Sequence, residues 1–187
     1  MQNEDDSYEW VLGNARRKAF LLSFDRPMIK SEINAKSAAF TSINSNIRLG
    51  EFLKRNLVIC LTPLIKEGRV YGLSEEGKSI AKRLSEPLHI KYDYSEPDID
   101  WGLYGKIACG KRKRAILGDI VEKGRITTIS NRYRARAETI KGTPRSYKYR
   151  IIGEFLKSAL VRKVIENSAP VYVPTEKAKR IKELLQS

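Results

Sequence analysis

The spacing of hydrophobic residues predicts three helices in the first part of the chain. Residues 8–24 carry apolar side chains at helical intervals and are expected to form the first helix. A short second helix is expected to begin after Ser31, because serine is a favourable N-cap. A third helix is expected over residues 41–55, and Asn56 follows it as a residue that tolerates the left-handed conformation of a helix C-terminal cap.

The pattern changes from helical to extended after this third helix. Residues 57–61 and 69–73 are rich in β-branched and apolar side chains, and a connection containing proline and glycine separates them. These features predict a β-hairpin. Ser74 is then expected to cap a last helix that runs to Leu84. The predicted order is therefore three helices, a hairpin and a final helix.

The second half of the chain repeats motifs of the first half in the same order. The pentapeptide at residues 50–54 recurs unchanged at residues 153–157. The other matched pairs are Glu9-Trp10 with Asp100-Trp101, Arg17-Lys18-Ala19 with Lys113-Arg114-Ala115, Leu57-Val58 with Leu160-Val161, Val70-Tyr71 with Val171-Tyr172, and Ser74-Glu75 with Thr175-Glu176. Six matches in one order predict two copies of one domain, which differ in loop length.

Proline residues mark the boundary between the copies. Pro87 and Pro97 both disfavour helix at the residue before them. We therefore expect a first domain at residues 1–86, a linker at residues 87–99 and a second domain at residues 100–187. The fold class expected is mainly α with small β-hairpin wings.

The second copy is expected to differ from the first in its middle. Residues 128–140 are predicted to form a longer second helix that carries Arg132, Arg134 and Arg136. Pro144 suits the first turn of a third helix that continues to about Ser158. The hairpin that follows is expected to be shorter, with its tip at residues 167–170.

The hairpin and final-helix motifs resemble those of winged helix-turn-helix transcription regulators of archaea and bacteria, in particular the MarR and ArsR types. The motifs are Leu-Val-x-Cys-Leu-Thr-Pro at residues 57–63 and Gly-Arg-Val-Tyr-x-Leu-Ser-Glu-Glu-Gly-Lys at residues 68–78. The resemblance covers residues 8–84 and extends to residues 100–185 mainly through the repeat. It implies tandem winged helix-turn-helix domains of archaeal type, in which the third helix enters the major groove and the wing contacts the DNA backbone or the minor groove.

The charge distribution favours a nucleic-acid partner. The formal net charge is +14, and it is uneven, because residues 1–97 hold 15 Lys/Arg and 13 Asp/Glu whereas residues 98–187 hold 21 and 9. Concentrated positive charge attracts phosphate through counterion release. Double-stranded DNA is therefore the predicted partner, and a sequence-specific DNA-binding transcription regulator is the predicted function.

Candidate DNA-contacting residues are those opposite the core face of each third helix, with basic residues of the wing and the helix ends. The core faces are expected to be Leu49, Phe52 and Leu53 in the first copy, and Ile152, Phe155 and Leu156 in the second. Asparagine can read adenine and arginine can read guanine, while the other side chains would contact phosphates. The first-copy candidates are Ser42, Asn44, Ser45, Arg48, Lys66 and Arg69. The second-copy candidates are Lys111, Arg112, Lys113, Arg114, Arg132, Arg134, Arg136, Arg145, Ser146, Tyr147, Lys148 and Arg150.

Two alternatives to DNA regulation remain open from the sequence. Ile43 and Ile47 fall near the exposed face of the first recognition helix, which would suit contact with a protein of the transcription or replication machinery. The arginine-rich stretch at residues 132–150 contains Tyr133, Tyr147 and Tyr149, which would suit RNA binding by base stacking.

The sequence shows no pattern typical of an enzyme or a metal protein. Cys60, Cys109 and His89 lack the spacing of zinc ligands, so no metal or other cofactor is expected. A glycine-rich phosphate loop and a histidine–nucleophile pair are both missing from the sequence, which predicts a protein without catalytic activity.

The chain is also expected to be cytoplasmic and to have no membrane partner. Its hydrophobic runs are all shorter than a membrane span, and its acidic N-terminus does not read as a signal peptide. Because two tandem copies mimic a dimer within one chain, we expect either a monomer that acts as a pseudo-dimer or a homodimer.

Overall fold

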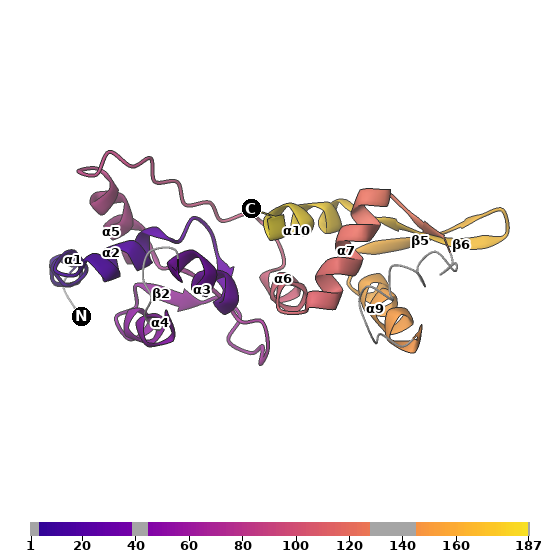
Figure 1. Ribbon diagram of the computed structural model, residues 1–187, viewed down its shortest axis with the longest axis horizontal. Coiled ribbons are helices and arrows are strands. Elements are labelled where there is room, and N and C mark those ends of the chain that lie inside the picture. The colour runs from indigo at the N-terminus through magenta and orange to yellow at the C-terminus, as the bar shows by residue number, and fades with distance from the viewer. Residues whose placement is uncertain (1–3, 39–44, 128–144, 187) are drawn as a thin grey trace. The chain divides into compact units, whose positions relative to one another are not determined.

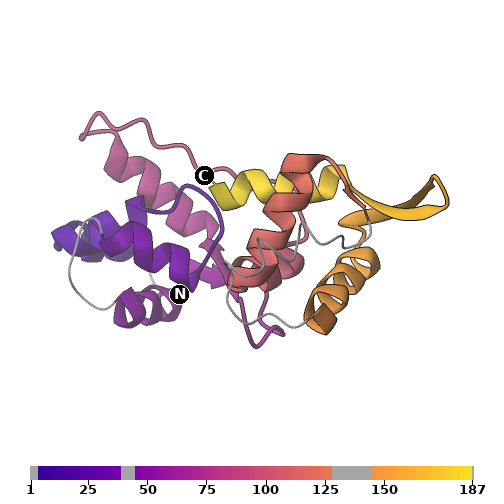
Figure 2. The same cartoon turned by 45° about the vertical axis from the view of Figure 1, so that its right-hand side comes forward.

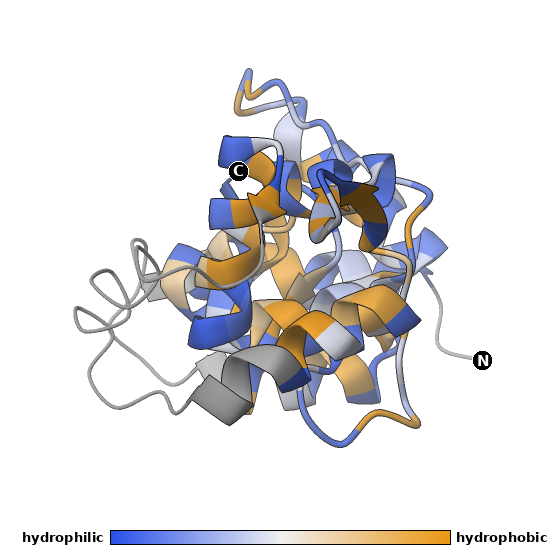
Figure 3. Cartoon of the chain, turned by 90° about the vertical axis from the view of Figure 1, so that its right-hand side faces the viewer, coloured by the Kyte–Doolittle hydropathy of each residue, from blue (hydrophilic) through white to orange (hydrophobic). Residues whose placement is uncertain are grey.

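The protein is mostly helical and has two small antiparallel sheets (Figure 1). The computed structural model describes residues 4–38, 45–127 and 145–186. It divides into two compact units, Met1–Cys109 and Gly110–Ser187. Hydrophobic and hydrophilic residues alternate along the helices (Figure 3), as expected when each helix buries one side. Within the described ranges, no helix is long and apolar enough to cross a membrane.

The first unit combines helices with a three-stranded sheet. Its described helices are α1 (Glu4–Leu12), α2 (Ala15–Leu22), α3 (Lys30–Ala38), α4 (Ser45–Lys54), α5 (Glu75–Ser85) and α6 (Trp101–Ala108). Its strands are β1 (Met28–Ile29), β2 (Val58–Cys60) and β3 (Val70–Leu73), which pair in the order β1-β3-β2. The predicted hairpin and the final helix after it are both confirmed.

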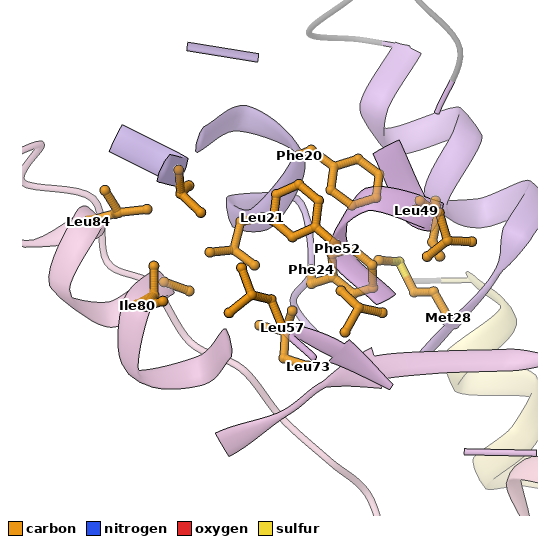
Figure 4. Close-up of a cluster of buried hydrophobic side chains, with 14 residues drawn as sticks. Phe20, Leu21, Phe24, Met28, Leu49, Phe52, Leu57, Leu73, Ile80 and Leu84 are labelled. Atoms are coloured by element: carbon orange, nitrogen blue, oxygen red, sulfur yellow. The ribbon is translucent and has the colours of Figure 1, made fainter. Parts of the chain in front are cut away.

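Aromatic rings from α2, from Phe24 just after it and from α4 form the centre of the first unit's core (Figure 4). The ring centroids of Phe20 and Phe52 lie 4.9 Å apart, and those of Phe20 and Phe24 lie 5.6 Å apart. All three side chains are buried, and burial of each contributes about 1.5–3 kcal/mol. Leu49 is buried with Phe52, so one side of α4 is fixed against the core and the other is left outward.

The second unit is smaller and has a long hairpin. Its described helices are α7 (Lys111–Lys123), α9 (Arg145–Lys157) and α10 (Glu176–Gln186). Its strands are β4 (Ile126–Thr127), β5 (Val161–Glu166) and β6 (Ala169–Pro174), which pair in the order β4-β6-β5. The β5–β6 hairpin projects from the helices of this unit (Figure 1, Figure 2). It has fewer connecting residues than the first hairpin, as predicted, but its strands are longer.

The two sheets share the same strand register. In the first unit Val58 of β2 pairs with Leu73 of β3, and in the second unit Val161 of β5 pairs with Pro174 of β6. These are the pairs that the sequence repeat aligns. The repeated motifs therefore correspond to repeated backbone structure in the part of the chain that is described.

The helices α4 and α9 end in the same way. Asn56 and Ala159 follow them in the left-handed conformation, with φ of 56° and 55°. In each case the next amide donates to the carbonyl of the phenylalanine five residues back, Phe52 or Phe155. The cap predicted at Asn56 is thus confirmed. Ala159 adopts it although its Cβ makes this conformation about 1–2 kcal/mol less favourable.

Two predictions about the helices of the first unit are wrong. Residues 8–24 do not form one helix, because Asn14 interrupts it and accepts the amide of Arg16 at 2.9 Å, which makes it the N-cap of α2. Ser31 is not the N-cap of α3, because that helix already begins at Lys30. Instead, the Glu32 carboxylate reaches back and accepts the amide of Ile29 at 2.9 Å.

The segment after α5 is tied to the first unit. The Tyr92 hydroxyl donates to the carbonyl of Phe24 at 2.7 Å, and the Tyr94 hydroxyl accepts the amide of Leu73 at 3.1 Å. Burial raises the pKa of Tyr94 to about 12, so this hydroxyl stays protonated at neutral pH. Residues 87–99, which the sequence predicts to be a linker, thus include a segment around Tyr92 and Tyr94 that is hydrogen-bonded to the first unit. We call this segment the strap.

The helix α6 also packs on the first unit, against β1 and β3. Its Tyr104 is buried, accepts a hydrogen bond from Arg26 at 3.0 Å and donates one to the Glu32 carboxylate. Burial and the negative charge of Glu32 raise the pKa of Tyr104. The repeat aligns α6 with α1, at the start of the second copy. The structural boundary instead falls after Cys109.

Two glycines allow α6 to contact the hairpin connection of the first unit. A Cβ on Gly105 would lie 1.9 Å from the carbonyl oxygen of Gly68, and a Cβ on Gly68 would lie 2.2 Å from that of Gly105. Gly68 also has a φ of +74°, which favours glycine. The connection between β2 and β3 therefore lies directly against α6.

Candidate nucleic-acid interface

Nearly all of the net positive charge belongs to the second structural unit. Residues 1–109 contain 16 Lys/Arg and 15 Asp/Glu, a net charge of +1, whereas residues 110–187 contain 20 and 7, a net charge of +13. The difference in net charge between the two parts is larger at this structural boundary, after Cys109, than at residue 97, where the sequence analysis divided the chain. A field of this kind is strong enough to concentrate polyanions at the second unit.

The helix α9 presents basic side chains on the side opposite the core. Ile151, Ile152 and Phe155 are buried, whereas Arg150 and Lys157 are exposed. The core position predicted at Leu156 is only half-buried, and Ile151 takes its place. Among the predicted candidates, the structure also places Arg145, Ser146, Tyr147 and Lys148 in the first part of α9.

A carboxylate links α9 to the start of α7. One Glu154 oxygen lies 2.7 Å from the Lys113 ammonium, and the other lies 3.8 Å from Arg150 Nε. The predicted basic cluster at residues 111–114 is thereby brought beside the outward side of α9. The sequence analysis did not pair Glu154 with Lys113, because that contact joins residues 41 apart.

The basic cluster occupies the first turn of α7. This helix begins at Lys111, its N-cap Gly110 offers no side-chain hydrogen bond, and no acidic residue stands in its first turn. Lys111 and Arg114 are exposed, and Arg112 is half-buried. Cations at a helix N-terminus oppose the helix dipole. An anion near this end would therefore relieve an unfavourable arrangement.

The β5–β6 hairpin adds two exposed cations that the sequence analysis missed. Arg162 and Lys163 are exposed on β5. The turn at Asn167 and Ser168 has φ of 48° and 63°, which matches a tight two-residue turn between the strands. The sequence of β5, Val-Arg-Lys-Val-Ile-Glu, does not alternate strictly between charged and apolar residues, so periodicity gave no clear signal for these two cations.

The helix α4 of the first unit presents an apolar side chain outward. Ile47 is 60% exposed, and the predicted core residue Leu53 is 36% exposed, so that prediction was wrong. Arg48 is half-buried, and its Nε is buried without a hydrogen-bond partner in the described part of the chain. The shared pentapeptide aligns Ile47 with Arg150, and Arg48 with the buried Ile151. Arg48 is therefore poorly placed to read DNA.

Two residues of the hairpin connection in the first unit, Gly68 and Arg69, already make contacts within that unit. Lys66 is exposed, but the Arg69 guanidinium donates from Nε to the carbonyl of Ile65 at 2.9 Å. Gly68 of the same connection contacts α6. Of the remaining candidates, Ser45 is the first residue of α4, and Ser42, Asn44, Arg132, Arg134 and Arg136 lie outside the described residues.

Metal-ligating side chains do not gather within the described ranges. No group of three or more His, Cys, Asp or Glu is placed there to hold a metal ion, and Cys60 and Cys109 are free thiols. No family model, curated protein or solved structure matches this chain. The function is therefore inferred from the residues and contacts described above.

Proposed function

We propose that this protein is a sequence-specific, double-stranded DNA-binding transcription regulator with two tandem winged helix-turn-helix domains, in which the second unit carries the DNA interface. The order of elements supports this fold. In both units a helix is followed by a hairpin and a final helix, with a short strand completing the sheet. In winged helices the corresponding helix enters the major groove.

The strongest support for DNA binding is the net charge of +13 on residues 110–187. Exposed cations of this unit lie on three elements that can face one duplex: Lys111 and Arg114 in the first turn of α7, Arg150 on the outward side of α9, and Arg162 and Lys163 on β5. Cations spread over helix and hairpin suit a duplex, which offers phosphates on both sides of a groove.

Each element has a distinct role in the proposed complex. Arg150 on α9 would read guanine in the major groove, a contact that contributes about 1–3 kcal/mol of discrimination. Lys111 and Arg114 would contact phosphates beside this groove. Arg162 and Lys163 would contact the DNA phosphates that lie next to the hairpin. Regulation would be steric, because a protein bound at a promoter blocks or recruits polymerase.

Salt-dependent binding tests this proposal. The whole protein is titrated against random duplex DNA of about 30 base pairs, single-stranded DNA and RNA, with fluorescence anisotropy as the readout. We expect tight duplex binding that weakens by about 10³-fold or more between about 50 and about 200 mM salt. Undetectable duplex binding by the folded protein would overturn it. Preferential RNA binding would overturn it in favour of RNA recognition.

A second candidate function, contact with a protein of the transcription machinery, applies to the first unit. Its net charge is +1, and its α4 places Ile47 where α9 places Arg150. An exposed isoleucine on a nearly neutral surface suits a protein partner better than phosphate. Loss of copurifying transcription machinery in Ile47→Ser, but not in Arg150→Ala, would favour this role. The reverse dependence would exclude it.

The ion pairs of Glu154 lead to a prediction about duplex affinity. Glu154→Gln is expected to raise affinity for random duplex about tenfold at about 0.1 M salt, because Lys113 and Arg150 are released from the carboxylate toward phosphate. The matched control is Glu176→Gln, which removes the same charge from a pair with Lys179 on α10. Equal affinities of the two variants would contradict a role for Glu154 in limiting phosphate contact.

A further inference from the structure

Two apolar residues lie side by side near the tip of the β5–β6 hairpin, one residue pair behind the last pair before the turn. Ile165 pairs directly with Pro170 across the hairpin, and directly opposed residues share one face of a sheet. Ile165 is 62% exposed, and no other large hydrophobic side chain of the second unit is exposed to this degree in the described residues. The hairpin of the basic unit thus carries an exposed apolar side chain close to its turn.

The hairpin is built to hold this tip in a fixed place. Each strand contributes six residues, and every one of them is paired with the opposite strand. The two-residue turn at Asn167 and Ser168 has the positive φ values that match the twist of a hairpin. The tip projects from the helices of its unit (Figure 1, Figure 2). Ile165 is therefore held in place by two strands that are paired along their whole length.

The charges near the tip suit a polyanion. Side chains alternate between the two faces of a strand, so Lys163 shares the face of Ile165, whereas Glu166 lies on the other face. Glu166 is the only carboxylate in residues 161–174, and it is paired with Arg125 at 3.3 Å. Arg162 adds an exposed cation next to Lys163. The cations can therefore contact phosphates while the apolar pair near the tip contacts an apolar surface.

We propose that this tip enters the minor groove of duplex DNA, and that Ile165 and Pro170 wedge between adjacent base pairs and bend the DNA. The minor groove is only about 6 Å wide, so the end of a two-stranded ribbon can enter it only if the groove opens. Unstacked bases expose apolar faces that can contact the wedge, and the bend brings more DNA against the basic unit. This inference rests on the proposed duplex binding and adds an architectural activity to it.

Energy transfer between dyes on the two ends of a duplex of about 30 base pairs tests the inference. The wild-type protein is expected to shorten the end-to-end distance, as a bend in the range of about 20–90° would. Ile165→Ser is expected to reduce the bend by about half or more. The control is Leu64→Ser, the same change at a 97% exposed residue of the first unit's hairpin connection, which should leave the bend unchanged.

The outcomes separate this inference from the proposed function. Tight duplex binding without bending, or equal bending by wild type and Ile165→Ser, would overturn the wedge and leave DNA binding in place. Undetectable duplex binding by the wild type would instead overturn the proposed function. Circular dichroism of both variants establishes that they fold. A bend lost only in Ile165→Ser would support the wedge.

Discussion

Replacing Lys111 and Arg114 together by glutamine is expected to weaken binding to random duplex DNA by about a hundredfold at about 0.1 M salt. Both side chains are exposed in the first turn of α7, beside the Lys113–Glu154 ion pair that leads to α9. Each lost phosphate contact lowers the slope of log affinity against log salt concentration by roughly one. This corresponds to about a tenfold loss of affinity at this salt concentration. Anisotropy titrations over a range of salt concentrations measure both quantities.

The control for this variant removes two cations from another helix of the same unit. Lys179 and Arg180 are exposed on α10, and their double replacement by glutamine lowers the net charge equally. If binding depended only on total charge, both double variants would lose the same affinity and the same salt slope. Such a result would show that the first turn of α7 is not part of the interface. Since glutamine at a helix N-terminus does not oppose the helix dipole, loss of folding is not expected.

Gly105→Ala is expected to destabilise the first unit by about 3 kcal/mol. The added Cβ would lie 1.9 Å from the carbonyl oxygen of Gly68, a backbone atom that cannot move without displacing the hairpin connection. Overpacking of this kind typically costs about 1–3 kcal/mol, which exceeds the gain in helix propensity from alanine. Thermal and urea unfolding, followed by circular dichroism, measure the change.

Gly50→Ala is expected to change the stability of the same unit in the opposite direction. Gly50 lies in α4, and no atom outside its local backbone lies within 4 Å of the position that a Cβ would take. Alanine there is expected to stabilise the unit by about 0.5–1 kcal/mol. Destabilisation by both substitutions, to the same extent, would show that the Gly68–Gly105 contact has no special importance for α6.

Local signals allowed much of the backbone to be predicted from the sequence. Ser74 was expected to begin the last helix of the first unit, and its hydroxyl accepts the amide of Gly77 at 3.0 Å. Asn56 was expected in the left-handed conformation, and it has that conformation. In each case the residue type acts on amides or torsion angles within a few positions of itself, so the signal survives without tertiary information.

Contacts between distant residues could not be predicted in the same way. Tyr104 reaches Glu32 across 72 positions, and Tyr92 reaches Phe24 across 68. No periodicity in the sequence links such pairs, so α6 and the strap were left outside the first domain. The strand β1 was missed because two residues are too few to show the alternation of a strand.

Exposure was predicted correctly for some of the candidate residues. Lys111 and Arg114 of α7 and Arg150 of α9 are exposed, whereas Arg112 and Lys113 are half-buried. The error at Leu53 comes from the phase assumed for the helical wheel of α4, which also turned Arg48 too far outward. A shift of one residue equals about 100° on a helix, which is enough to exchange a half-buried position for an exposed one.

The docking of α6 on the first unit means that the two copies are no longer equivalent modules. The first copy of the sequence repeat ends before Asp100, whereas the packing of the first unit continues through the buried Tyr104 to Cys109. A recombination event or an engineered fusion at the repeat boundary would separate Tyr104 from Arg26 and Glu32. It would leave the buried Arg26 and the half-buried Glu32 without the hydroxyl that now hydrogen-bonds to both. The first unit thus depends on a helix that the sequence repeat assigns to the start of the second copy.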